Sequence, residues 1–108
     1  MSRKGINRSI LIGILSFLIF SCKKEEAVPL AEANFYAQIQ NCINDTCVVY
    51  FYDNSTHAVN WNWDFGNGQH SSKINDSTTY NQLGNFEVSL TVKNSKGIEA
   101  KKIKTISL

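Results

Sequence analysis

Hydrophobic and polar side chains alternate along much of this chain, and that alternation limits its possible folds more than any other feature. Three runs show it, at residues 35–39, 59–65 and 86–92. Successive side chains of a β-strand point to opposite faces of the sheet, so each run predicts a strand with one apolar face and one polar face. Clusters of Asn, Asp, Ser and Gly separate the runs and are typical of turns.

Strands of this kind hide their apolar faces when two sheets pack against each other. The residues from 34 onward therefore predict an all-β fold, an antiparallel β-sandwich. Sharp chain reversals are expected at residues 66–68 and 93–97, which contain types that tolerate positive φ. In the last strand Ile103 is out of phase with the other apolar residues, Ile98, Ala100, Ile106 and Leu108. A bulge or a loosely packed middle is expected there.

Residues 1–21 have the order of features found in an export signal. Basic residues, Arg3, Lys4 and Arg8, precede an uncharged apolar run of eleven residues at 10–20. A transmembrane helix needs about 20 apolar residues, so this run is short for a membrane span. We expect residues 1–21 to be a signal peptide and the protein to be exported.

The segment Leu18-Ile19-Phe20-Ser21-Cys22 resembles a bacterial lipobox. The resemblance implies that Cys22 becomes a lipidated N-terminus that anchors the protein to a membrane. An ordinary secreted protein cleaved near Ser21 is the alternative. Residues 22–33 show no repeating apolar face and are expected to be a tether to a domain at 34–108.

The triplet Lys24-Glu25-Glu26 is similar to an export tag of some lipoproteins of Bacteroidetes-type bacteria. That similarity implies an outer-membrane location, with exposure on the cell surface as one outcome. A solvated charge cluster is the alternative.

The charge balance of the mature protein excludes one class of partner. The chain has 11 basic and 9 acidic residues, and three of the basic residues lie in the signal peptide. The remainder has a net charge near −1. A nucleic-acid-binding protein needs a concentrated basic face, so no nucleic-acid partner is expected.

Two cysteines, Cys42 and Cys47, remain in the mature chain beside Cys22. In an oxidising compartment they are expected to form a disulfide across a tight turn at Asn44-Asp45. Two free thiols are the alternative. The two histidines, His57 and His70, lack the spacing of a zinc site with these cysteines, and neither a metal nor a cofactor is expected.

Four segments together resemble a PKD domain. The most specific is Trp63-Asp64-Phe65-Gly66-Asn67-Gly68, which matches that family's Trp-Asp-Phe-Gly-Asp-Gly hallmark except at Asn67. Residues 49–55 fit its Val-x-Phe-x-Asp-x-Ser strand, Asn75 and Tyr80 fit a third segment, and residues 84–92 fit Gly-x-Tyr-x-Val-x-Leu-x-Val. The resemblance implies an immunoglobulin-like antiparallel β-sandwich of about seven strands.

The resemblance also implies roles for particular residues. Trp63 would pack between the sheets, and Asp64 would hold the turn at 66–68 by accepting backbone N–H bonds. Some PKD domains bind calcium near such turns, which makes Asp53, Asp64 and Asn67 weak calcium candidates.

The resemblance implies a noncatalytic module that binds proteins or polysaccharides. We therefore expect that this protein is not an enzyme. His70 precedes Ser71 and Ser72, but no Gly-x-Ser-x-Gly elbow surrounds them. A candidate binding surface combines aromatic and amide side chains on the outer face of one sheet, namely Tyr36, Gln38, Tyr50 and Tyr52.

Other interpretations stay open from the sequence. The tyrosines of the candidate surface could merely cover the sheet, and the protein could be a structural subunit or spacer of an envelope assembly. A small hydrolase is a further alternative. Asp76-Ser77-Thr78 also resembles a short O-glycosylation acceptor of Bacteroidetes-type bacteria.

Overall fold

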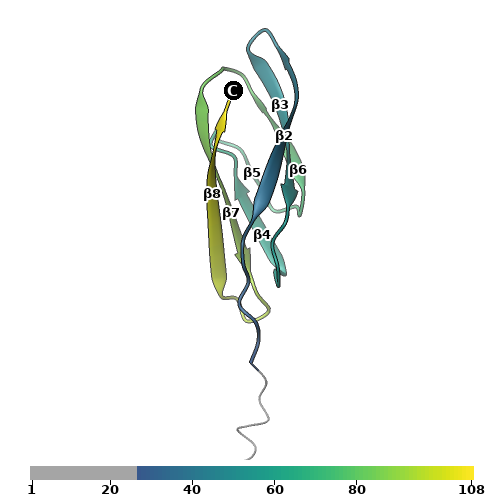
Figure 1. Ribbon diagram of the computed structural model, residues 1–108, viewed down its shortest axis with the longest axis vertical. Helices are drawn as coiled ribbons and strands as arrows, with labels where there is room; N and C mark the ends of the chain where they lie inside the picture. The colour runs from purple at the N-terminus through teal and green to yellow at the C-terminus, as the bar shows by residue number, and fades with distance from the viewer. Residues whose placement is uncertain (1–26) are drawn as a thin grey trace, which may run out of the picture.

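The computed structural model describes residues 27–108, and all regular structure in that range is β-strand (Figure 1). The strands are β2 (Phe35–Ile43), β3 (Thr46–Asp53), β4 (Asn60–Asp64), β5 (His70–Ser71), β6 (Asp76–Tyr80), β7 (Asn85–Lys93) and β8 (Glu99–Ser107). They form a three-stranded sheet, β2-β3-β6, and a four-stranded sheet, β5-β4-β7-β8, with antiparallel pairing throughout. The predicted all-β, immunoglobulin-like sandwich of seven strands is confirmed.

The expected signal peptide, residues 1–21, and the expected lipidation site, Cys22, lie outside the described residues. Within residues 27–108 the structure contains no helix that could cross a bilayer.

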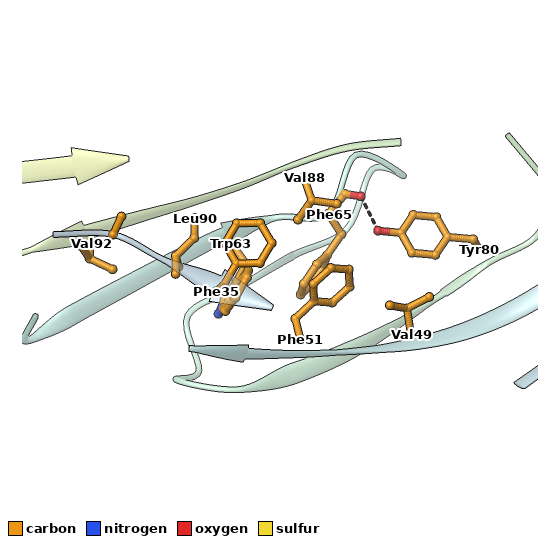
Figure 2. Close-up of a cluster of buried hydrophobic side chains, with 10 residues drawn as sticks. Phe35, Val49, Phe51, Trp63, Phe65, Tyr80, Val88, Leu90 and Val92 are labelled. Atoms are coloured by element: carbon orange, nitrogen blue, oxygen red, sulfur yellow. Dashed lines mark hydrogen bonds between the residues drawn. The ribbon is translucent and has the colours of Figure 1, made fainter. Parts of the chain in front are cut away.

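Large apolar side chains from both sheets fill the space between them (Figure 2). The alternation predicted the inward face of β7, and the resemblance to the PKD family implied that of β3. Val49, Phe51, Val88, Leu90 and Val92 on these faces are each fully buried. The remaining large core side chains are Phe35, Trp63, Phe65 and Tyr80. Burial of each such side chain contributes about 1.5–3 kcal/mol, so this layer is the main source of stability.

Trp63 lies at the centre of the core, as its place in the family motif implied. Its ring meets Phe35 edge to face with centroids 5.1 Å apart, and lies 5.7 Å from the ring of Phe51. Its indole Nε1 donates a hydrogen bond to the carbonyl of Lys73, at 2.9 Å. A buried tryptophan needs such an acceptor, because an unpaired N–H inside a protein is costly.

The turn at residues 66–68 is fixed by its own polar side chains. Asp64 Oδ1 accepts the N–H of Gly66 at 3.0 Å, and Asn67 Oδ1 accepts that of Gln69 at 3.1 Å. Asn67 Nδ2 also donates to the hydroxyl of Thr78 on β6. These bonds give the turn its shape and connect the two sheets at this edge.

Tyr80 makes a second connection between the sheets. Its hydroxyl donates to the carbonyl of Phe65 at 2.6 Å (Figure 2). Burial, with a smaller effect from the charge of Asp64, raises the pKa of Tyr80 above its usual value. The hydroxyl therefore keeps its proton and stays a donor over the whole physiological range.

The last strand differs from one of its two expected forms. The pairing of β7 with β8 runs without a register shift from Lys93 opposite Glu99 to Asn85 opposite Ser107, so the expected bulge is wrong. The loosely packed alternative holds, because Lys101, Lys102 and Ile103 are all exposed. A bulge occurs instead in β2, between Ile39 and Asn41, where the edge strand leaves the apolar layer.

Lys104 has an inward position on β8 without being a core residue. Its Nζ donates to the carbonyl of Phe35 and lies 5.1 Å from the centre of the Phe35 ring. The apolar stem of the lysine covers the open edge of the sandwich while the ammonium group stays near water.

Part of the expected tether at residues 22–33 contacts the sandwich. Asn94 Nδ2 donates to the carbonyl of Pro29 at 3.0 Å, and Glu32 forms an antiparallel bridge with Thr56. Ala33 belongs to the core. The packed domain therefore begins near Pro29, a few residues before the expected boundary at residue 34.

The expected disulfide between Cys42 and Cys47 is confirmed. The two residues are directly opposite in the β2–β3 hairpin, next to a turn in which Asn44 and Asp45 both have positive φ. The hairpin projects at the end of the molecule that holds the C-terminus (Figure 1).

Replacement of both Cys42 and Cys47 by serine is expected to lower the free energy of unfolding by about 2 kcal/mol, because the bond closes a short loop. Urea denaturation of the oxidised protein and the double variant measures the difference. The same urea midpoint for both proteins would show that the bond does not stabilise the fold.

Candidate binding surface

Three tyrosines form a row on the outer face of the three-stranded sheet. Tyr36 lies opposite Tyr52, and Gln38 lies opposite Tyr50, in the pairing of β2 with β3. Their neighbours Val49 and Phe51 point inward and are 0% exposed, so alternation turns the tyrosines outward. All four residues expected on this face are therefore brought together, and we call them the tyrosine surface.

The rings of the tyrosine surface are nearly parallel. Tyr36 and Tyr52 have centroids 5.1 Å apart with planes at 23°, and Tyr50 and Tyr52 have centroids 6.5 Å apart with planes at 20°. Tyr36 is 54% exposed and Tyr50 38% exposed. Cross-strand aromatic pairs restrict each other's rotamers, so the surface presents fixed aromatic rings and hydroxyl groups to solvent.

A shallow depression of about 360 Å³ adjoins this surface, lined by Tyr50, Phe51, Tyr52, Asn75, Asp76 and Ser77. Ser77 lies opposite Tyr50 in the pairing of β3 with β6. Hydrogen bonding from the side chain of Ser71 lowers the pKa of Asp76, with smaller contributions from Ser77 and Lys73. The depression thus places a carboxylate, an amide and a hydroxyl beside aromatic rings.

The polar side of this depression was not predicted as part of a binding site. The sequence associates Asn75 with a segment of the PKD family, and Asp76-Ser77-Thr78 with an O-glycosylation acceptor motif. The sequence carried no clear signal for this polar side, because the burial of Thr78 between Ser77 and Thr79 depends on the pairing of β6 with β3. Because Thr78 is 9% exposed and accepts a bond from Asn67, Ser77 is the accessible hydroxyl of the Asp76-Ser77-Thr78 motif.

The weak calcium candidates have separate structural roles. Asp53 Oδ1 accepts the N–H of Ser55 at the end of β3, while Asp64 and Asn67 hold the turn between β4 and β5. Over residues 27–108, His, Cys, Asp and Glu side chains form no group of three that could hold a metal ion.

His70, Ser71 and Ser72 lie at the rim of a second open depression, of about 540 Å³, beside Trp61. The hydroxyl of Ser71 accepts the N–H of Lys73 and hydrogen-bonds to Asp76. In the described part of the chain, the side-chain hydrogen bonds include none between a serine and a histidine. Activation of a serine nucleophile by histidine needs such a pair, so this arrangement does not resemble a serine–histidine catalytic site.

The fold and the tyrosine surface define a small immunoglobulin-like sandwich with an exposed aromatic face. Residues 27–108 show no catalytic-looking group of side chains. Residues 26–108 match the family model described as PKD domain. The chain therefore belongs to the PKD domain family.

Two solved structures are similar to this chain over nearly their whole length. The PKD1 domain of Vibrio anguillarum Epp has 30% sequence identity and a TM-score of 0.66, with 76% of this chain and 96% of that chain covered. The PKD1 domain from the Vibrio cholerae metalloprotease PrtV has 27% identity and a TM-score of 0.63, with 74% and 98% covered.

Curated relatives match over a much smaller part of their length. Collagenase ColQ1 of Bacillus cereus is 36% identical over 56 residues, which are 52% of this chain and 6% of that protein. Collagenase ColA of Clostridium perfringens is 41% identical over 49 residues, which are 43% and 4%. The chain thus spans about a twentieth of the length of these collagenases, and the similarity is limited to that small part of each.

Proposed function

We propose that this protein is a lipid-anchored envelope protein that presents a noncatalytic PKD domain for binding polysaccharide through the tyrosine surface. The supporting observation is the row of Tyr36, Tyr52 and Tyr50 on an exposed sheet face. Aromatic rings and hydroxyls together suit the flat, polyhydroxylated faces of sugars, and rigid tyrosines lose little entropy when they bind. The polar depression at Asn75 and Ser77 offers hydrogen bonds next to the rings.

Replacement of Tyr36 and Tyr50 by alanine is the test of this surface. Each tyrosine at the centre of a binding surface is worth about 2 kcal/mol, so the double variant is expected to bind at least a hundredfold more weakly. A glycan array identifies a ligand, and titration calorimetry with that glycan measures the affinities.

The matched control is Asn62→Ala, which changes an exposed residue on the outer face of the other sheet. It is expected to bind like the unmodified protein. Equal affinity of the tyrosine double variant and the control would rule out the tyrosine surface. Loss of the fold in the double variant, seen by circular dichroism, would show that the tyrosines are structural. Capture of one stoichiometric protein partner and no glycan would favour the spacer or subunit role.

The anchoring part of the proposal rests on the lipobox-like segment that ends at Cys22. Mass spectrometry of the protein extracted from membranes should show a lipid-modified N-terminal cysteine. Cys22→Ala should move the protein from the membrane to the soluble fraction. Protease treatment of intact cells then distinguishes the outer face of the envelope from the inner one.

A further inference from the structure

Three segments meet at the end of the sandwich where the chain enters it. They are the entry segment at residues 28–30, the β3–β4 loop at 57–59 and the β7–β8 turn at 94–98. A small depression of about 200 Å³ is lined by residues from all three, including Pro29, Val59 and Asn94. This end is opposite the one that holds the C-terminus (Figure 1).

Asn94 fixes the entry segment to this end. It is 2% exposed, and its Oδ1 accepts the N–H groups of Lys96 and Ile98. Its Nδ2 donates to the carbonyl of Pro29. A buried amide that makes three hydrogen bonds holds its partners firmly. The entry segment therefore leaves the sandwich at a defined point, next to Asn94.

Exposed apolar side chains surround that exit point, one on each segment. Leu30 is 66% exposed, Val59 53% and Ile98 48%. The same end carries exposed lysines at Lys93 and Lys96, with Glu99 as the register partner of Lys93. Exposed apolar side chains beside lysines are typical of a protein surface that inserts at the boundary between lipid headgroups and acyl chains.

The length of the tether keeps this end near the membrane. Seven residue steps separate Cys22 from Pro29, and a fully extended chain of that length spans about 25 Å. A domain whose Pro29 is fixed by Asn94 therefore stays close to the bilayer surface if Cys22 carries the lipid. The short distance raises the local concentration of lipid headgroups at Leu30, Val59 and Ile98.

We propose that Leu30, Val59 and Ile98 form a membrane-contact surface that rests on the headgroup layer of the bilayer in which Cys22 is anchored. This inference depends on the lipid anchoring proposed above. The contact stands the sandwich upright, with its strands along the membrane normal. The tyrosine surface then faces sideways, open to a ligand, and the disulfide hairpin points away from the membrane.

Depth-dependent fluorescence quenching tests the contact. The domain at residues 27–108 holds every core residue described above, and similar PKD1 domains are solved as separate chains, so it is suitable alone. It is bound through an N-terminal histidine tag to phosphatidylethanolamine–phosphatidylglycerol vesicles that contain chelating lipid and a headgroup-region quencher. A dye is attached at Ser95→Cys in the turn, or at Asn81→Cys near the opposite end.

Quenching at position 95 is expected to exceed that at position 81 by roughly threefold or more. The variant L30S/V59S/I98S should remove this difference, because it deletes the apolar contact. Leu83→Ser, which changes a similarly exposed apolar residue near the opposite end, should leave the difference intact. All three serine sites are exposed, and circular dichroism verifies that the variant stays folded.

Equal quenching at the two positions, or an unchanged difference in the triple variant, would overturn the proposal. The chelating lipid replaces the lipid on Cys22 in this experiment. Failure of lipidation therefore cannot produce the negative result, and mass spectrometry of the native protein reports on lipidation separately.

Discussion

Gly66→Ala is expected to lower the free energy of unfolding by roughly 3 kcal/mol. Gly66 has φ of +78°, which costs an alanine about 1–2 kcal/mol. A Cβ at this position would also lie 2.5 Å from the backbone oxygen of Glu87. Because that oxygen belongs to β7, the turn or the strand must move. Urea denaturation followed by tryptophan fluorescence measures the loss.

Gly68→Ala is the matched control in the same turn. Its φ is +91°, but no atom lies within 4 Å of the added Cβ. Only the conformational cost of about 1–2 kcal/mol is expected. If the two variants lost the same stability, contact with Glu87 would not be the reason that glycine is needed at position 66.

Trp63→Ala is expected to cost about 3–5 kcal/mol, because it leaves a large cavity at the centre of the core. It also leaves the carbonyl of Lys73 without its indole donor. A domain of this size has a total stability of roughly 4–12 kcal/mol, so a substantial part of the molecules is expected to unfold near 37 °C. Thermal denaturation by circular dichroism measures the change.

Trp61→Ala provides the comparison, since Trp61 lies two residues earlier on β4 with the same inward phase. Trp61 is only partly buried, and its Nε1 is buried without a hydrogen-bond partner. A loss of about 1–2 kcal/mol is expected. A larger loss for Trp61 than for Trp63 would contradict the position given to Trp63 at the centre of the core.

Alternation predicted the core of the sandwich well, because a period of two fixes which side chains share a face. It located the inward residues of β4 and β7, including Trp63, and the resemblance to the PKD family added Val49 and Phe51 on β3. The ends of the runs were less predictable. Ile39 and Val59 have the apolar phase but are 50% and 53% exposed, since the opposite sheet does not cover them.

The strand β6 could not be found from its own residues. Its sequence, Asp-Ser-Thr-Thr-Tyr, has one aromatic side chain and no apolar alternation. It forms a strand because β3 offers it a pairing edge and Asn67 bonds to Thr78. Thr78, Thr79 and Tyr80 favour β-structure, but these tertiary contacts decide that the segment becomes a strand of this sheet.

For the candidate site, the sequence predicted which residues share the tyrosine surface but not what surrounds them. Because Val49 and Phe51 were expected to point inward, Tyr50 between them was expected to point outward. The depression beside it depends on the packing of residues 75–77 against β3. These residues are more than twenty positions from Tyr50 in the sequence. Asn94 was missed for the same reason, because its partner Pro29 is 65 residues away.

The lysines of β8 have a consequence for contacts between copies of this domain. β8 is an edge of the four-stranded sheet, and an unpaired edge can recruit another edge strand. A second β8 would bring Lys101, Lys102 and Lys104 within about 5 Å of like charges, the spacing of paired strands. Two such edges therefore repel each other, which opposes the pairing of copies of this domain into a continuous sheet.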